Sequence, residues 1–327
     1  MTTGNELIVG YNQVSDVPFY HLSVQHDLGR EAEMVMLALS VAGLRNQLLM
    51  SPWPEHIGPK PRETLARDYK LLFGAVSEPL ARLHKGGRDH LCIHPHGPYH
   101  FHPLQLAAPN DNSLASDWIV TTIPHPAILR ERIGGASGSR DCPIVALGHD
   151  FLGGQPHGLH ALPGAADEAR LVASICGGPA YVNAEATSGR LIEALHCATW
   201  VHVATHGSPC VVAPAFQCLY LHPESSSDGI VRAYELTGLD LRGLDLVTLS
   251  ACETSLGRFD VGDNLRGLTA ALFVAGCATI VSTLWPVSNP AARVFFETLY
   301  KSILKGTSKL DSFCTAQVAV RESSGVA

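Results

Sequence analysis

Two apolar runs in the last third of the chain each end near a chemically reactive side chain. The run Val201–Ala204 is followed closely by His206, and the run Leu246–Leu249 is followed closely by Cys252. Short, nearly continuous apolar runs are typical of strands buried on both faces of a parallel sheet. The carboxyl ends of parallel strands open into one crevice. If these runs are neighbouring strands, the two side chains meet at one sheet edge, although they lie 46 residues apart in sequence.

Short apolar runs alternate with helical patterns along most of the chain. This alternation predicts an α/β fold, with a mainly parallel sheet flanked by helices on both faces. A hairpin is expected between the two reactive residues, over Val211–Val231. The expected strands are His90–Ile93, Trp118–Thr122, Pro143–Leu147, Ala180–Asn183, Thr199–Ala204, Leu246–Leu249 and Ala278–Thr283, and the expected helices are Pro126–Arg132, Ala166–Cys176, Ser188–His196, Asn264–Ala275, Pro290–Lys305 and Ser308–Val320.

The first 85 residues have a different pattern. One strand is expected at Leu7–Val9, followed by helices over Arg30–Leu49 and Pro61–Leu83, where apolar residues recur at helical spacing. The sequence therefore predicts a mostly helical N-terminal extension, residues 1–85, packed on a larger α/β domain, residues 86–327.

The composition limits the classes of function. Hydrophobic residues make up 46% of the chain and charged residues 16%, which favours a folded globular protein. The net charge is −7 and no basic stripe is present, which argues against direct nucleic-acid binding. The cysteines number nine, form no CxxC pair and follow an N-terminus without a signal-peptide pattern. These features favour a reducing, cytoplasmic location.

An uncharged stretch over residues 267–292 is long enough to be compared with a membrane span. We interpret it instead as a buried helix that ends at Gly276, followed by a strand that ends before Pro286, because glycine and proline interrupt it. No membrane contact is therefore expected.

His206 and Cys252 together suit nucleophilic catalysis. A free thiol has a pKa of about 8.5, so a neighbouring imidazole is needed to take its proton near neutral pH. The backbone N–H groups of Gly207 and Cys252 are candidate donors to an oxyanion. Either side chain alone would more often be a packing residue, but two matching strand ends favour a catalytic pair.

Several segments share a pattern that is typical of one protein family. They are Leu162–Ala165 with Glu168 and Ala169, Ala204–Gly207, Leu249–Thr254, Asp263–Leu268 with Ala275 and Gly276, and Ser282–Val287. Together they resemble the CHAT family of caspase-like cysteine peptidases, which are relatives of separase. The resemblance implies a caspase-like fold, an endopeptidase with a His206–Cys252 dyad and a polypeptide substrate, without cofactor or metal.

Three residues are candidates for substrate binding. Asn289 stands where the family usually has an aspartate, which in relatives faces a basic substrate residue; an amide cannot neutralise arginine or lysine. Asn289 followed by Pro290 also suits a helix N-cap. Asp263 matches an acidic family position and is equally a plausible N-cap, while Glu253 points either toward the substrate or to solvent.

Two other patterns are weak evidence for a metal site and for a phosphate-binding site. Four histidines, His94, His96, His100 and His102, suggest zinc, but the segment resembles a family hairpin that binds no metal and lacks a nearby carboxylate or thiolate. The glycine-containing segment 148–154 follows an expected strand but lacks the pattern of a phosphate-binding loop.

The resemblance also shapes the expected partners. We expect cleavage of a specific protein partner in a bacterial signalling or defence system. Family members often carry helical repeats before this domain, whereas about 85 residues precede it here, so a separate activating protein is expected. The alternative is a catalytically silent caspase-like scaffold that binds a peptide in the same crevice.

Overall fold

The computed structural model divides the chain into two compact units, each considered by itself. One comprises Met1–Ile128 with Phe259–Asn264, and the other comprises Leu129–Arg258 with Leu265–Ala327. The structure describes residues 6–10, 20–27, 30–37, 70, 73, 77–87, 89–94, 117–122, 142–152, 156–208, 210, 213–251, 258–259, 265–283 and 287–323.

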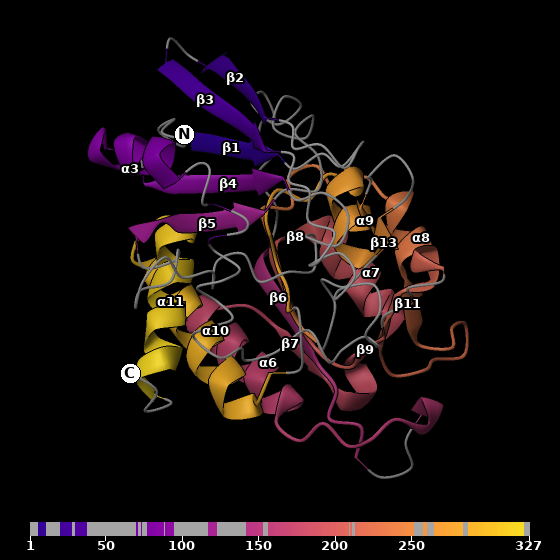
Figure 1. Ribbon diagram of the computed structural model, residues 1–327. Coiled ribbons are helices and arrows are strands. Elements are labelled where there is room, and N and C mark those ends of the chain that lie inside the picture. Colours follow the sequence, from indigo (N-terminus) through magenta and orange to yellow (C-terminus); the bar gives the residue numbers. More distant parts are fainter. Residues whose placement is uncertain are drawn as a thin grey trace. The chain divides into compact units, whose positions relative to one another are not determined.

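The first unit contains a five-stranded sheet in the order β2-β3-β1-β4-β5 (Figure 1). Strand β1 pairs in parallel with β3 and β4, β4 pairs in parallel with β5, and only β2 runs antiparallel to its neighbour β3. The described elements are β1 Glu6–Gly10, β2 Tyr20–Asp27, β3 Arg30–Leu37, α3 Ser77–Lys85, β4 His90–His94 and β5 Ile119–Thr122.

The helix expected from Arg30 is wrong over its first eight residues, which form strand β3. Glutamate, alanine, methionine and leucine favour helices locally. Here the segment pairs with β2 on one side and β1 on the other, so ladder pairing outweighs propensity. The strand expected at Leu7–Val9 is confirmed, and the second expected helix is described as α3 with helical Lys70 and Phe73.

The second unit is built on an all-parallel sheet in the order β15-β12-β8-β6-β7. Each of these strands was expected from its apolar run, so the predicted α/β class with a mainly parallel sheet is confirmed. Its strands are β6 Cys142–Gly148, β7 Ala180–Val182, β8 Ala198–Ala204, β12 Leu246–Ser250 and β15 Ile280–Val281.

Helices cover both faces of this sheet (Figure 1). Along β8, Val201 and Val203 pack into the cluster that contains α7, α8 and α9, whereas Trp200 packs into the cluster that contains α6, α10 and α11. This alternation is the strand period of two. The helices are α6 Ala165–Cys176, α7 Ser188–Cys197, α8 Ala233–Thr237, α9 Leu268–Ala275, α10 Asn289–Leu304 and α11 Lys309–Ser323.

The hairpin expected between His206 and Cys252 is confirmed as an antiparallel ribbon in the order β11-β10-β9. The remaining short elements include three turns of 3-10 helix. The elements are β9 Gly207–Ser208, β10 Cys218–Tyr220, β11 Ile230–Arg232, β13 Arg258–Phe259, β14 Leu265–Arg266, η4 Pro156–Gly158, η5 Asn183–Glu185 and η6 Pro214–Phe216.

Helix α9 begins four residues later than expected, so Asp263 is not its N-cap. The cap position is Gly267, and the buried N–H of Leu268 donates at 2.7 Å to the side-chain oxygen of Gln217, which is also buried. A long-range bond thus replaces the local cap that the sequence suggested. At the other end Gly276 adopts φ 116°, as its expected place after the helix requires.

Some expectations fall outside the described residues, including the helix over Pro126–Arg132 and three of the four clustered histidines. The compact units divide at Ile128, whereas the sequence suggested a boundary near residue 85, which remains a prediction. Within the described ranges, no helix combines the length and the hydropathy that a membrane crossing needs.

Gly148 allows β6 and α6 to approach closely, which gives a first testable prediction. A Cβ at this position would lie 2.4 Å from the carbonyl oxygen of Ala165 and 2.8 Å from the Cβ of Ala169. Gly148→Ala should lower the free energy of unfolding by about 1–3 kcal/mol, because backbone must move. Gly238→Ala, where a Cβ meets nothing within 4 Å, is the control and should be nearly neutral in the same denaturant titration.

Candidate active site

The ends of β8 and β12 lie side by side. The two strands pair in parallel, with Ala204 opposite Ser250, and the N–H of Thr205 donates to the carbonyl of Ser250 at 3.2 Å. His206 therefore leaves β8 at the same sheet edge at which the chain leaves β12 toward Cys252. Cys252, Glu253 and Asp263 lie outside the described residues.

The imidazole of His206 has a defined hydrogen bond. Its Nε2 lies 2.8 Å from the carbonyl oxygen of His160. A carbonyl oxygen only accepts, so in the neutral ring the proton is assigned to Nε2 and the lone pair to Nδ1. The arrangement leaves Nδ1 as the basic atom of this half-buried side chain.

Gly207 presents its backbone N–H away from the neighbouring strand. The N–H of Tyr220 donates to the carbonyl of His206 at 3.0 Å, and the next pair along the ribbon is Gly207 with Leu219. Hydrogen-bonded and non-hydrogen-bonded pairs alternate along antiparallel strands. The N–H of Gly207 therefore faces away from β10, as an oxyanion donor would.

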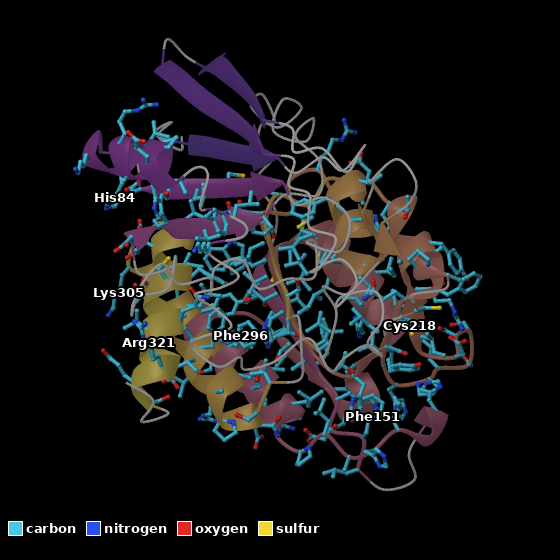
Figure 2. All side chains as sticks on the ribbon, viewed as in Figure 1. His84, Phe151, Cys218, Phe296, Lys305 and Arg321 are labelled. Carbon is cyan, nitrogen blue, oxygen red and sulfur yellow. The ribbon has the colours of Figure 1, made fainter. Side chains whose placement is uncertain are left out.

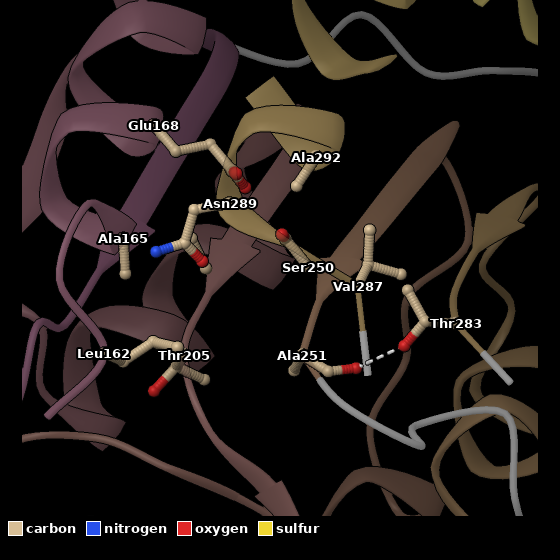
Figure 3. Close-up of a pocket in the computed structure, with 11 residues that line it drawn as sticks. Leu162, Ala165, Glu168, Thr205, Ser250, Ala251, Thr283, Val287, Asn289 and Ala292 are labelled. Carbon is tan, nitrogen blue, oxygen red and sulfur yellow. Dashed lines mark hydrogen bonds between the residues drawn. The ribbon is translucent and has the colours of Figure 1, made fainter. Parts of the chain in front are cut away.

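A small pocket opens at this edge of the sheet (Figure 3). Apolar and polar side chains both line it, and the carboxylate of Glu168 points toward its middle. The pocket has five polar lining side chains among the described residues: Glu168, Thr205, Ser250, Thr283 and Asn289.

Asn289 lines this pocket, but it is not the N-cap of α10. The helix begins at Asn289 and the cap position is Ser288. The side-chain amide of Asn289 donates instead to the carbonyl of Pro163, in the turn before α6. The capping interpretation is therefore wrong, because a partner distant in sequence takes the amide.

The segment after β15 holds the end of β12. Thr283 donates its hydroxyl proton to the carbonyl oxygen of Ala251 at 2.6 Å (Figure 3). Ala251 immediately precedes Cys252, so this bond fixes the last described residue before the candidate nucleophile.

Beneath the pocket, a chain of buried polar side chains begins at Glu168. The Oε1 of Glu168 lies 3.1 Å from Nε2 of His202, whose Nδ1 lies 2.7 Å from the hydroxyl of Thr248. Thr248 in turn lies 2.7 Å from the hydroxyl of Tyr300, and burial raises the pKa of that phenol. Phe296 lies on α10 (Figure 2), and its ring packs edge-on against His202.

His202 lies on β8 and belongs to this buried network. Its side chain hydrogen-bonds to residues on α6 and β12. Glu168 was noted only as part of a motif, and its place in the pocket was missed. The sequence signal that could have identified Glu168 is a lone carboxylate on the apolar face of a helix.

His149, immediately after β6, is a second residue that the sequence did not single out. It is 5% exposed, its Nδ1 accepts the N–H of Phe151 at 3.0 Å, and its Nε2 has no hydrogen-bond partner among the described residues. Burial, followed by repulsion from His222, lowers its pKa from 6.5 to about 4. It is therefore a neutral ring at physiological pH.

A family model and two known proteins are similar to parts of this chain. The family model of the CHAT domain matches residues 66–327. Tetratricopeptide repeat protein 28 from Mus musculus is 30% identical over 194 residues, covering 50% of this chain and 8% of that protein. The Homo sapiens protein of the same name is 28% identical over 194 residues, with the same coverage. The chain thus spans under a tenth of these relatives.

The lowered pKa of His149 makes stability depend on pH. The His149 ring binds a proton more tightly in the unfolded chain than in the folded protein. The neutral ring therefore contributes fully to stability above pH 6.5, and this contribution is lost as pH falls toward 4. The free energy of unfolding falls by at most about 3 kcal/mol through this group. We expect the Tm of the native protein to fall more between pH 7 and pH 4.5 than that of His149→Asn. Parallel curves for the two proteins would contradict this.

Breaking the Glu168–His202 pair should be costly. His202→Leu leaves the buried carboxylate of Glu168 without its partner, and we expect unfolding to become easier by about 3–5 kcal/mol. Glu168→Gln keeps a side-chain oxygen that can accept from Nε2 of His202 and should cost about 1 kcal/mol. Urea titrations of both variants measure the difference, and equal losses would show that the charge is unimportant.

Proposed function

The chain belongs to the CHAT domain family, which is related to caspase-like peptidases, and on that premise we propose that it is a cysteine endopeptidase. Cys252 is the nucleophile and His206 is the general base. Gly207 and Cys252 donate their backbone N–H groups to the oxyanion.

The single observation that supports this proposal most is the parallel pairing of β8 and β12. The register Ala204–Ser250 and the bond from Thr205 to Ser250 bring the strand that carries the base beside the strand that leads to the nucleophile. The assignment of the base to Nδ1 of His206 is supported because Nε2 of the same ring is hydrogen-bonded to the carbonyl oxygen of His160.

The reaction follows from these roles. His206 Nδ1 takes the proton from the Cys252 thiol, and the thiolate attacks the carbonyl carbon of the scissile peptide bond. The resulting oxyanion accepts hydrogen bonds from the two backbone N–H groups. His206 then protonates the leaving amine, the C–N bond breaks, and water hydrolyses the thioester to release the acid and restore the thiol.

The pocket beside this edge is proposed to receive a substrate side chain. Asn289 lines it as an uncharged hydrogen-bonding group, so strict selection of arginine or lysine by this residue is not expected. Asp263 and Glu253 remain proposed substrate contacts.

The proposed setting is cleavage of a specific protein partner in the cytoplasm, within a bacterial signalling or defence system and after activation by a separate protein. The matched mammalian relatives do not bear on that setting.

Thiol reactivity tests the dyad without knowledge of the substrate. Iodoacetamide at pH 7 should alkylate Cys252 faster than Cys210, and His206→Ala should slow the reaction at Cys252 by about 10–100-fold. Peptide mass mapping follows each cysteine in the native protein. Cys210→Ala is the matched control and should leave the rate at Cys252 unchanged.

Cleavage is tested with a proteome-derived peptide library, using Cys252→Ala as the inactive control. New peptide ends that appear with the native protein and vanish with this variant would support the proposal. If Cys252 reacts no faster than Cys210, and reacts independently of His206, the chain is better described as a silent peptide-binding scaffold.

A further inference from the structure

We propose that Phe151, held in place by His149, is a positioning residue for the imidazole of His206. This inference rests on the proposed function, in which His206 is the general base. Neither Phe151 nor His149 belongs to the motifs that indicated the catalytic pair.

Three aromatic rings lie in series at the edge of the sheet. The His149 ring stacks on Phe151 with centroids 4.0 Å apart and planes 15° apart. The Phe151 ring contacts His206 at a centroid distance of 4.9 Å and an angle of 55°. Phe151 is fully buried. The His206 ring is therefore in contact with a buried side chain that is itself stacked on a second ring.

The backbone of Phe151 adopts an unusual conformation to reach this place. Its φ is 53°, in the left-handed region that a bulky aromatic residue rarely occupies. Its N–H donates to Nδ1 of His149 at 3.0 Å, and the N–H of His149 donates to the carbonyl of Ala204, at the end of β8, at 3.0 Å. Such a conformation persists only where the surroundings determine it, and it is most common at functional sites.

The same loop holds the acceptor of His206. The carbonyl of Asp150 accepts the N–H of Leu162 at 2.7 Å, and its Oδ1 accepts the N–H of Ala166 at 2.9 Å. These bonds fix the segment that carries His160, whose carbonyl accepts from His206 Nε2 at 2.8 Å. One short loop thus positions both the carbonyl group that hydrogen-bonds to His206 and the Phe151 ring that contacts the imidazole.

Fixing a ring in two directions has a chemical consequence. The hydrogen bond to His160 selects the tautomer with Nε2 protonated, and the contact with Phe151 limits rotation of the His206 ring about its Cβ–Cγ bond. Together they keep the lone pair of Nδ1 aimed in one direction. A small displacement of a catalytic group costs as much as 100-fold in rate, so a support of this kind matters for proton transfer.

The test measures the tautomer of His206 by ring ¹⁵N NMR, with His206→Gln for assignment, and the iodoacetamide rate at Cys252. Phe151→Leu keeps an apolar side chain without the ring. We expect a mixed His206 tautomer and a fall of about 10–100-fold in the Cys252 rate. Phe295→Leu removes a ring that packs against Phe296 and Phe313, and as the control it should change neither readout.

His149 variants keep the test decisive if Phe151→Leu folds poorly. His149→Leu removes the acceptor for the Phe151 N–H and should reproduce both effects. His149→Asn offers an oxygen near the position of Nδ1 and should stay within about 3-fold of the native rate. The double variant His149→Leu/Phe151→Leu should be no slower than either single variant, because both act through one contact.

A native His206 tautomer and a native Cys252 rate in both Phe151→Leu and His149→Leu would overturn the inference. If His206→Gln leaves the native Cys252 rate unchanged, the proposed dyad fails. The tautomer measurement still decides whether Phe151 positions the His206 ring, because it does not depend on catalysis.

Discussion

The parallel pairing of β8 with β12 is the interaction on which the site depends. Both strands lie inside the sheet of the second unit, between β6 and β15, so each is hydrogen-bonded on both sides. Their register is also fixed by side chains that alternate between two buried helical layers, because a slip by one residue would exchange the faces. The residues that directly follow the two strands are therefore also held in defined positions, although they belong to loops.

The loop ends around this edge are held by bonds between segments distant in sequence. Thr283 binds the carbonyl of Ala251, the amide of Asn289 binds the carbonyl of Pro163, and the N–H of His149 binds the carbonyl of Ala204. Carbonyl groups at strand ends have no partner within the ladder and need one when buried. These three hydrogen bonds connect the ends of β6 and β8, the ends of β12 and β15, and the starts of α6 and α10.

The buried polar chain from Glu168 to Tyr300 serves a different purpose from the loop that holds His206. It crosses the face of the sheet beneath the pocket and joins α6, β8, β12 and α10 through three hydrogen bonds. An unpaired member of such a chain is costly in a low-dielectric interior, so the four groups specify one arrangement of these elements. The pocket thus has a carboxylate at its base that is already partnered.

The α/β class, the places of the strands in the second unit and the family could all be predicted from the sequence. Short apolar runs and helical periodicity depend on local neighbours, and the motifs at Ala204–Gly207 and Leu249–Thr254 are contiguous. Contacts in the folded protein were needed to establish that Arg30–Leu37 is a strand, that Asn289 binds Pro163 instead of capping its helix, and that His202 pairs with Glu168. Contacts of the same kind bring His149 and Phe151 to His206, and the sequence does not reveal them because the separation of these residues in the chain carries no periodic signal.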